Sequence, residues 1–334
     1  MRLVILLSAV LLWPAAAVGA PCTKVVADCT EWVALGRGPA RSLVYRSYPL
    51  TARNDRIRRA LVVLHSAARD PHNAFRTAAA AAALAGALGD TIVIAPRFAS
   101  NDGRSCGDAL AADEVNWPCD GNSWRSGGVA RDGTLTSFDF ADELLGKLAA
   151  RAVFPRLQAI VVAGHSAGGQ FAARYQMANR IHETLGVRVR YVVANPSSYA
   201  YPDSSRPVNA SGSIAFQPVS ARTCDGYNRW PYGLESRSGY ARSATSEQLR
   251  RQLAERPTTY LLGAQDVLPN IAFDASCPAM AQGPTRLARG QAFATLVNRA
   301  YGARHALIVV PRCGHQESCM FTASLALPIL FPKD

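Results

Sequence analysis

Apolar and polar residues alternate in blocks along this chain of 334 residues. Short, continuous apolar runs are typical of buried parallel strands, and they occur at 60–65, 91–95, 157–163, 187–194, 258–262 and 306–310. Stretches with dense alanine or helical spacing lie between or after them, at 75–88, 138–152, 170–180, 247–255, 289–301 and 321–327. We expect one earlier strand at 42–48. Strands that alternate with helices predict an α/β fold, with a mostly parallel sheet covered by helices on both faces.

Two long segments without such a pattern interrupt the alternation, at 96–137 and 195–240. Loops of this length in a compact domain are usually functional, so we expect both to form a cap or rim over the carboxyl edge of the sheet. Their aromatic residues either line a substrate cleft or anchor the loops to the body of the domain. These residues are Trp117, Trp124, Tyr199, Tyr201, Tyr227 and Trp230.

The amino terminus has the pattern of a secretory signal. A basic start at Met1-Arg2 precedes an apolar run at 3–13, and small residues follow up to Ala20. We predict a signal peptide at 1–20 and a single domain at 21–334, secreted or periplasmic. An uncleaved membrane anchor is the alternative, but the run is short for one. No later stretch has eighteen apolar residues in a row, so stable membrane insertion is not expected.

Composition adds little about partners. Lysine and arginine number 36 against 24 acidic residues, a formal charge of +12, but only three of the basic residues are lysines. This bias is typical of a genome's codon usage, although a basic surface also attracts anionic polymers. There is no concentrated basic run or recognition motif, so no nucleic-acid partner is expected. We expect a monomer.

The eight cysteines predict four disulfides, because secreted proteins mature in an oxidising compartment. Eight cysteines allow 105 pairings. Short loops cost the least entropy to close, which favours Cys22–Cys29, Cys106–Cys119, Cys313–Cys319 and, by remainder, Cys224–Cys277.

The segment Gly164-His165-Ser166-Ala167-Gly168 matches the pattern G-x-S-x-G. It stands directly after an expected buried strand and directly before an expected helix, which is the context that this motif requires. The serine of such a turn is raised above the sheet edge, and side chains at the two glycines would collide with neighbouring backbone. We therefore take Ser166 as the candidate nucleophile; the alternative is a glycine-rich turn with a bystander serine.

A serine hydroxyl needs a base, and the base needs an acid that orients it. In this motif's usual context the acid and then the histidine follow the serine along the chain. His315 lies in a loop after the last expected strand, which suits the base. Asp266 follows the strand at 258–262 and suits the acid, with Asp274 as the second choice. The alternative reading of either aspartate is a turn cap.

A hydrolytic serine also needs two N–H groups that face the developing oxyanion. One is expected from Ala167, the residue after the nucleophile. The other is expected from the loop after His65, at Ser66 or Ala67. The lipase signature HGGG is absent, because His65-Ser-Ala-Ala-Arg69 stands in its place.

The chain resembles the α/β-hydrolase superfamily of serine hydrolases. Several segments are similar to those of secreted esterase-like and poly(3-hydroxybutyrate) depolymerase-like proteins, and together they fall within 58–331. They are GHSAGGQFAARY around Ser166, ANPSSYAY at 194–201, YLLGAQD at 260–266, CPAMAQG at 277–283 and VVPRCGHQESCMF at 309–321. The resemblance implies hydrolysis of small-molecule or polymeric carboxylic esters without a cofactor. It also places Ser166, Asp266 and His315 at the triad positions.

The sequence thus predicts a serine hydrolase that cleaves esters through an acyl-enzyme. A peptidase, an amidase or a cofactor-free perhydrolase on the same fold is one alternative. A non-catalytic secreted binding protein is another, and the order of the three triad residue types argues against it.

Overall fold

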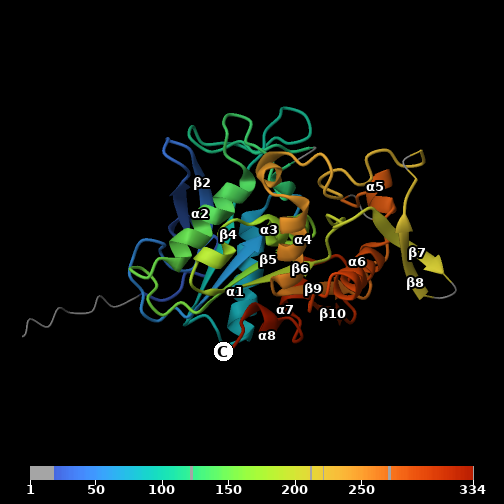
Figure 1. Cartoon of the computed structure of the whole chain (residues 1–334). Coiled ribbons are helices and arrows are strands. Elements are labelled where there is room, and N and C mark those ends of the chain that lie inside the picture. Colours follow the sequence, from blue (N-terminus) through green and yellow to red (C-terminus); the bar gives the residue numbers. More distant parts are fainter. Residues whose placement is uncertain (1–18, 121–122, 211–212, 221, 270–271, 334) are drawn as a thin grey trace, which may run out of the picture.

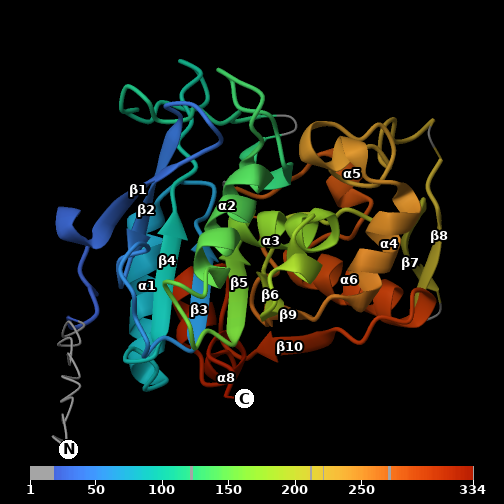
Figure 2. The same cartoon turned by 60° about the vertical axis from the view of Figure 1, so that its left-hand side comes forward.

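The computed structural model describes residues 19–120, 123–210, 213–220, 222–269 and 272–333. Residues 1–18 of the predicted signal peptide lie outside this range. Eight strands form the central sheet in the order β1-β2-β4-β3-β5-β6-β9-β10. The sheet lies in the middle of the molecule in Figure 1, and its strands can be followed in this order in Figure 2. The strands are β1 (Thr30–Ala34), β2 (Arg41–Arg46), β3 (Arg59–Leu64), β4 (Thr91–Pro96), β5 (Ala159–His165), β6 (Arg188–Ala194), β9 (Thr258–Gly263) and β10 (Ala306–Val310). The pairs β1·β2 and β2·β4 are antiparallel, and the other five pairs are parallel.

Helices cover both faces of this sheet (Figures 1 and 2). One face packs on α1 (Pro71–Leu84), α7 (Glu317–Thr322) and α8 (Leu327–Leu330). The other packs on α2 (Ser137–Ala149), α3 (Ala167–Ala178), α4 (Ser246–Glu255) and α6 (Arg286–Ala300). The remaining short helices are α5 (Cys277–Met280), η1 (Ala27–Cys29), η2 (Trp124–Ser126), η3 (His182–Thr184) and η4 (Gly239–Ser243).

The two helix layers explain why the strands are apolar along their whole length. Side chains of a strand point alternately to opposite faces, so Val62 and Leu64 of β3 join the core under α2 and α3. Leu61 and Val63 of the same strand join the core under α1 and α7. Because both faces are covered, the apolar run has no polar alternation, and the predicted α/β fold with a mostly parallel sheet is confirmed.

Two features differ from the expectation. The strand β1 was not predicted, and the segment 195–240 is not irregular throughout, because it contains the hairpin β7 (Ser205–Ala210) and β8 (Ser213–Pro218). Prolines at 207 and 218 obscure the hairpin in the sequence, since proline within a short run argues against a strand.

The aromatic residues of the two long segments anchor them to the domain. Trp117 is fully buried and stacks on Phe140 of α2, while Trp124 stacks on Phe98. Tyr199 stacks on Phe293 of α6. Since the other three aromatic residues are also buried, packing rather than a substrate cleft accounts for this set, whose remaining members are Tyr201, Tyr227 and Trp230.

The four disulfides have the pairing that loop length favoured: Cys22–Cys29, Cys106–Cys119, Cys224–Cys277 and Cys313–Cys319. Within the described ranges, no helix has the length and apolar character needed to cross a bilayer.

The turn between β5 and α3 is the most crowded backbone near the sheet's carboxyl edge. A Cβ atom at Gly164 would collide with the backbone of Gly168, and one at Gly168 would collide with the carbonyl of Leu64 in β3. Both obstacles are main-chain atoms of packed elements, so they cannot move aside as a flexible side chain would.

We predict that Gly164→Ala lowers the free energy of unfolding by about 1–3 kcal/mol, because the added methyl forces the backbone apart. Gly146→Ala is the matched control, since a Cβ at this position in α2 meets nothing within 4 Å. The control should stabilise the protein by about 0.5–1 kcal/mol, through helix propensity. Urea unfolding monitored by circular dichroism measures both, and equal midpoints for Gly164→Ala and wild type would contradict the crowding argument.

Candidate active site

Ser166 occupies the turn between β5 and α3 with φ of 58° and ψ of −116°. A positive φ is unfavourable for a residue with a side chain. The backbone is fixed there because the Ser166 N–H donates to the carbonyl of Ala194 in β6 at 2.9 Å. The Ser166 carbonyl in turn accepts from the Gln170 N–H of α3 at 2.9 Å. The serine therefore stands at the carboxyl end of β5, ahead of a helix amino terminus.

His315 and Asp266 meet Ser166 in a continuous hydrogen-bonded chain. His315 Nε2 lies 2.9 Å from Ser166 Oγ, and His315 Nδ1 lies 2.7 Å from Asp266 Oδ2. The residues are 149 and 49 positions apart in the sequence, so only the fold brings them together. With the proton on Nδ1, the imidazole donates to the carboxylate and Nε2 accepts the serine O–H.

The loop that carries His315 is braced from two sides. The disulfide Cys313–Cys319 closes it. Asn195, at the end of β6, donates from Nδ2 to the carbonyl of Gly314 at 3.2 Å and accepts from the Gly263 N–H at 2.8 Å. Sequence reasoning missed Asn195; its φ of 44° is a conformation that asparagine tolerates better than most residues.

The acid Asp266 is almost fully buried, at 2% exposed. Its second oxygen faces Arg286 Nη1 at 3.4 Å, and Arg286 Nε donates to Ser197 Oγ at 2.9 Å. Burial lowers the pKa of Arg286, while Asp266 opposes that shift. This buried ion pair was also missed, because an arginine at the first turn of α6 has no distinguishing local pattern.

The second choice for the acid, Asp274, lies elsewhere. It accepts from the Tyr232 hydroxyl at 2.9 Å and from the N–H and hydroxyl of Ser276. It thus has the role of a turn residue, and His315 takes Asp266 as its partner.

A second histidine lies against the first. The rings of His165 and His315 have centroids 4.6 Å apart. Burial is the main reason that the pKa of His165 lies well below its ordinary value, and the neighbouring His315 and Arg286 lower it further. His165 is therefore neutral at physiological pH and adds no charge beside Ser166.

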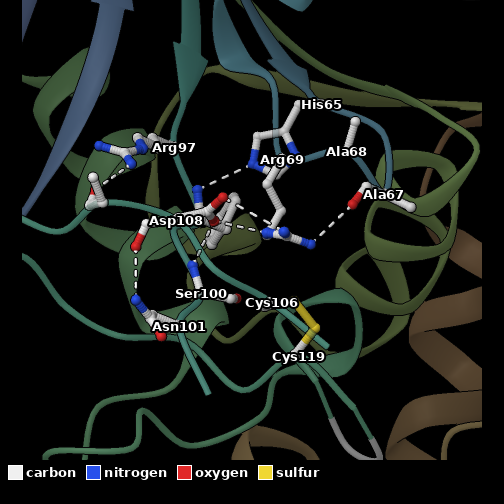
Figure 3. A network of polar contacts seen from close by, with 12 residues as sticks. His65, Ala67, Ala68, Arg69, Arg97, Ser100, Asn101, Cys106, Asp108 and Cys119 are labelled. Atoms are coloured by element: carbon white, nitrogen blue, oxygen red, sulfur yellow. Dashed lines mark hydrogen bonds and ion pairs between the residues drawn. A yellow bond between two sulfur atoms is a disulfide. The ribbon is translucent and has the colours of Figure 1, made fainter. Parts of the chain in front are cut away.

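The loop after β3 offers free N–H groups beside the serine. In the part of the chain that the structure describes, the backbone N–H groups of Ser66, Ala67 and Ala167 donate no hydrogen bond. Figure 3 shows how this loop is held. Arg69 donates from Nη1 to the carbonyl of Ala67 at 3.1 Å and from Nε to Asp108 Oδ2 at 2.7 Å.

Asp108 belongs to the long segment after β4, and that segment is itself fastened. The Asp108 carboxylate accepts from the Ser100 N–H at 2.8 Å, and its carbonyl accepts from Asn101 Nδ2 at 3.0 Å. The disulfide Cys106–Cys119 lies beside this network (Figure 3). At the base of the loop, His65 Nε2 accepts from the Phe98 N–H at 3.0 Å. Burial lowers the pKa of His65 to about 4, so it acts there as a neutral acceptor.

A cavity of about 380 Å³ opens onto Ser166. The described residues of its wall are Ser66, Ala67, Ala68, His165, Ser166, Ala272, His315 and Glu317. A larger hollow of about 820 Å³ lies along α2, but its lining includes neither a serine nor a histidine. Of these two cavities, the smaller one has the candidate nucleophile and the candidate base in its wall.

One group within the described ranges brings three potential metal ligands within 4.8 Å of one another: Asp102, Cys119 and Asp120. Cys119 is bonded to Cys106, so its sulfur is no thiolate. Two carboxylates remain, which is fewer than the four ligands of a structural zinc site.

Comparison with known proteins bears on the fold. No family model and no curated protein matches this sequence. Among solved structures, the chain is similar to the poly(3-hydroxybutyrate) depolymerase LpqC from Bordetella parapertussis, with 22% identity, a TM-score of 0.61 and 90% of each chain covered. It is also similar to poly(aspartic acid) hydrolase-1 from Sphingomonas sp. KT-1, with 20% identity, a TM-score of 0.59, and 90% of this chain and 97% of the other covered. The chain has the α/β-hydrolase fold, as the sequence indicated.

Proposed function

We propose that this protein is a serine hydrolase that cleaves carboxylic esters with Ser166, His315 and Asp266 as its triad. The hydrogen-bonded chain from Asp266 through His315 to Ser166 carries the proposal. Acyl transfer needs a nucleophile, a base within hydrogen-bond reach and a group that orients the base.

The reaction starts when Ser166 Oγ attacks the ester carbonyl while His315 Nε2 takes the serine proton. Asp266 holds the imidazole in the required tautomer and stabilises its charged form. The carbonyl oxygen becomes an oxyanion, and the N–H groups of Ala167 and of Ser66 or Ala67 are placed to stabilise it. His315 then protonates the leaving alcohol, and the C–O bond to the alcohol breaks.

Water completes the cycle. His315 removes a proton from a water molecule, which attacks the acyl-enzyme carbonyl, and the serine leaves with that proton as the carboxylic acid is released. Both halves of the reaction use the same oxyanion position. The network of Arg69 and Asp108 therefore supports both halves by holding the loop after β3.

Three further observations support the proposal. The two similar structures are those of a poly(3-hydroxybutyrate) depolymerase and a poly(aspartic acid) hydrolase. The cavity beside Ser166 has apolar methyl groups in its wall, which suit the acyl or alcohol chain of an ester. Four disulfides are typical of the secreted or periplasmic location that the signal sequence predicts. The substrate is a small-molecule or polymeric ester.

We expect Ser166→Ala and His315→Ala each to lower kcat/KM for p-nitrophenyl acetate by about ten thousandfold or more, because each removes a group that acts in the transition state. Asp266→Asn should lower kcat/KM by a similar factor, since an amide favours the wrong imidazole tautomer. Asp274→Asn is the matched control and should change kcat/KM by less than about threefold. Full activity of His315→Ala, or a larger loss in Asp274→Asn than in Asp266→Asn, would contradict the assignment.

Arg69→Lys should lower kcat by about ten- to a hundredfold while KM changes little, because the oxyanion forms only in the transition state. Lysine has one nitrogen and cannot hold Ala67 and Asp108 together.

Arg97→Lys is the control for Arg69→Lys. Arg97, which Figure 3 labels, lies in the long segment after β4 that also contains Asp108. It forms an ion pair with Glu114 at 3.1 Å, away from the loop after β3. Steady-state kinetics on one ester compares the two variants. An equal loss in both would mean that loosening the long segment, rather than moving the oxyanion N–H groups, lowers the rate.

A further inference from the structure

Glu317 is an acidic residue of the catalytic cavity that the proposed reaction does not use. It is the first residue of α7 and follows His315 by two positions. Its side chain lines the same cavity as Ser166 and His315. A group that fills this cavity would therefore lie beside Glu317.

Within the described ranges, no ion pair compensates the charge of the Glu317 carboxyl group. Its Oε1 atom is buried and, among the described residues, accepts no hydrogen bond. The charged group that acts on it is another acid, Asp70, at the start of α1. Buried carboxylates are costly unless a cation or several donors face them.

The basic groups nearby are engaged elsewhere or neutral. Arg69 is held by Asp108 at 2.7 Å, and His72 Nδ1 lies 2.8 Å from Asp70. His165 stays neutral because its pKa lies well below its ordinary value. His315 is committed to Asp266 and Ser166. Burial, reinforced by Asp70, raises the pKa of Glu317 to about 8.

The other residues of the cavity wall indicate which class of ligand the cavity binds. Ala67, Ala68 and Ala272 contribute only methyl side chains, and no arginine or lysine lines the cavity in the described structure. An anionic group in the cavity would meet Glu317 with no cation to balance it. An ammonium group would supply the countercharge that the carboxyl lacks.

We propose that Glu317 selects esters that carry a cationic ammonium group on the portion that enters the catalytic cavity. This inference rests on the proposed esterase function and adds its substrate class. The ammonium group lies against the Glu317 carboxylate, and the ester carbonyl lies over Ser166. The strongly basic composition of the whole chain does not conflict with this selection, because among the described residues no arginine or lysine lines the cavity, whereas Glu317 does.

The preference for a cationic ester should depend on pH, because Glu317 takes up and releases a proton. Below about pH 8 the carboxyl is mainly protonated, so a cationic ester must displace a proton in order to bind. Above that pH the carboxylate is already charged. The preference for a cationic ester over an uncharged ester of equal shape should therefore rise with pH and level off above about pH 8.

Two isosteric pairs of esters test the proposal, one for each side of the ester bond. The alcohol side is tested with acetylcholine against 3,3-dimethylbutyl acetate. The acyl side is tested with the p-nitrophenyl esters of 4-trimethylammoniobutanoate and 5,5-dimethylhexanoate. The quaternary ammonium group of the cationic esters keeps its charge at every pH. Because both esters of a pair use the same triad, the ratio of their kcat/KM values removes the pH dependence of the triad from the comparison. Acid release is measured in a pH-stat from pH 6 to pH 9.5.

We expect the cationic member of at least one pair to be favoured by about tenfold or more at pH 9, with the ratio falling towards one at pH 6. In Glu317→Gln the ratio should be close to one and independent of pH. Glu143→Gln is the matched control, because Glu143 lies on α2 and pairs with Lys147 at 3.2 Å. It should keep the wild-type ratio at every pH.

The outcomes separate the two proposals. Hydrolysis of the neutral esters with a ratio near one in both wild-type pairs, at every pH, overturns the role of Glu317 and leaves the esterase function standing. A wild-type preference that persists in Glu317→Gln also overturns it. No hydrolysis of any of the four esters overturns both proposals. The wild-type pH profile decides the matter even if Glu317→Gln does not fold.

Discussion

The crowded turn between β5 and α3 is the constraint on which the candidate site depends. Ser166 keeps its unfavourable backbone conformation because β6 holds its N–H and α3 holds its carbonyl. The turn fits against β3 only because Gly164 and Gly168 have no side chains. The tight packing that fixes the serine also brings β3 and its following loop next to it, so the candidate nucleophile and the free N–H groups of that loop share one location.

The other residues of the candidate site lie on loops around this fixed serine, and each loop is held in place by a different kind of interaction. A disulfide and Asn195 hold the loop of His315. A buried ion pair with Arg286 holds the acid Asp266. Rigid support of this kind matters for catalysis because a small displacement of a reacting group costs a large factor in rate. Glu317 has no such supporting role. It lines the cavity, and its Oε1 atom has no hydrogen-bond partner in the described structure.

The sequence was sufficient for features that rest on local patterns. Continuous apolar runs predicted the parallel strands, the glycines around Ser166 predicted the tight turn, and short spacing predicted the disulfide pairs. Features that depend on contacts between distant segments were not predictable. The partners Arg286 and Asn195 belong to this class, as does the pair of Arg69 and Asp108, because no local spacing marks them. The hairpin of β7 and β8 was missed because its prolines resemble those of a loop.

The central claim is that Ser166 is a nucleophile activated by His315. A fluorophosphonate probe tests it most directly, because the probe forms a covalent bond only with an activated hydroxyl, and peptide mass spectrometry locates the bond. The account predicts one adduct, on Ser166, in the wild-type protein and strongly slowed labelling in His315→Ala. No adduct in the folded wild-type protein, or an adduct on another residue that persists equally in Ser166→Ala, would contradict it.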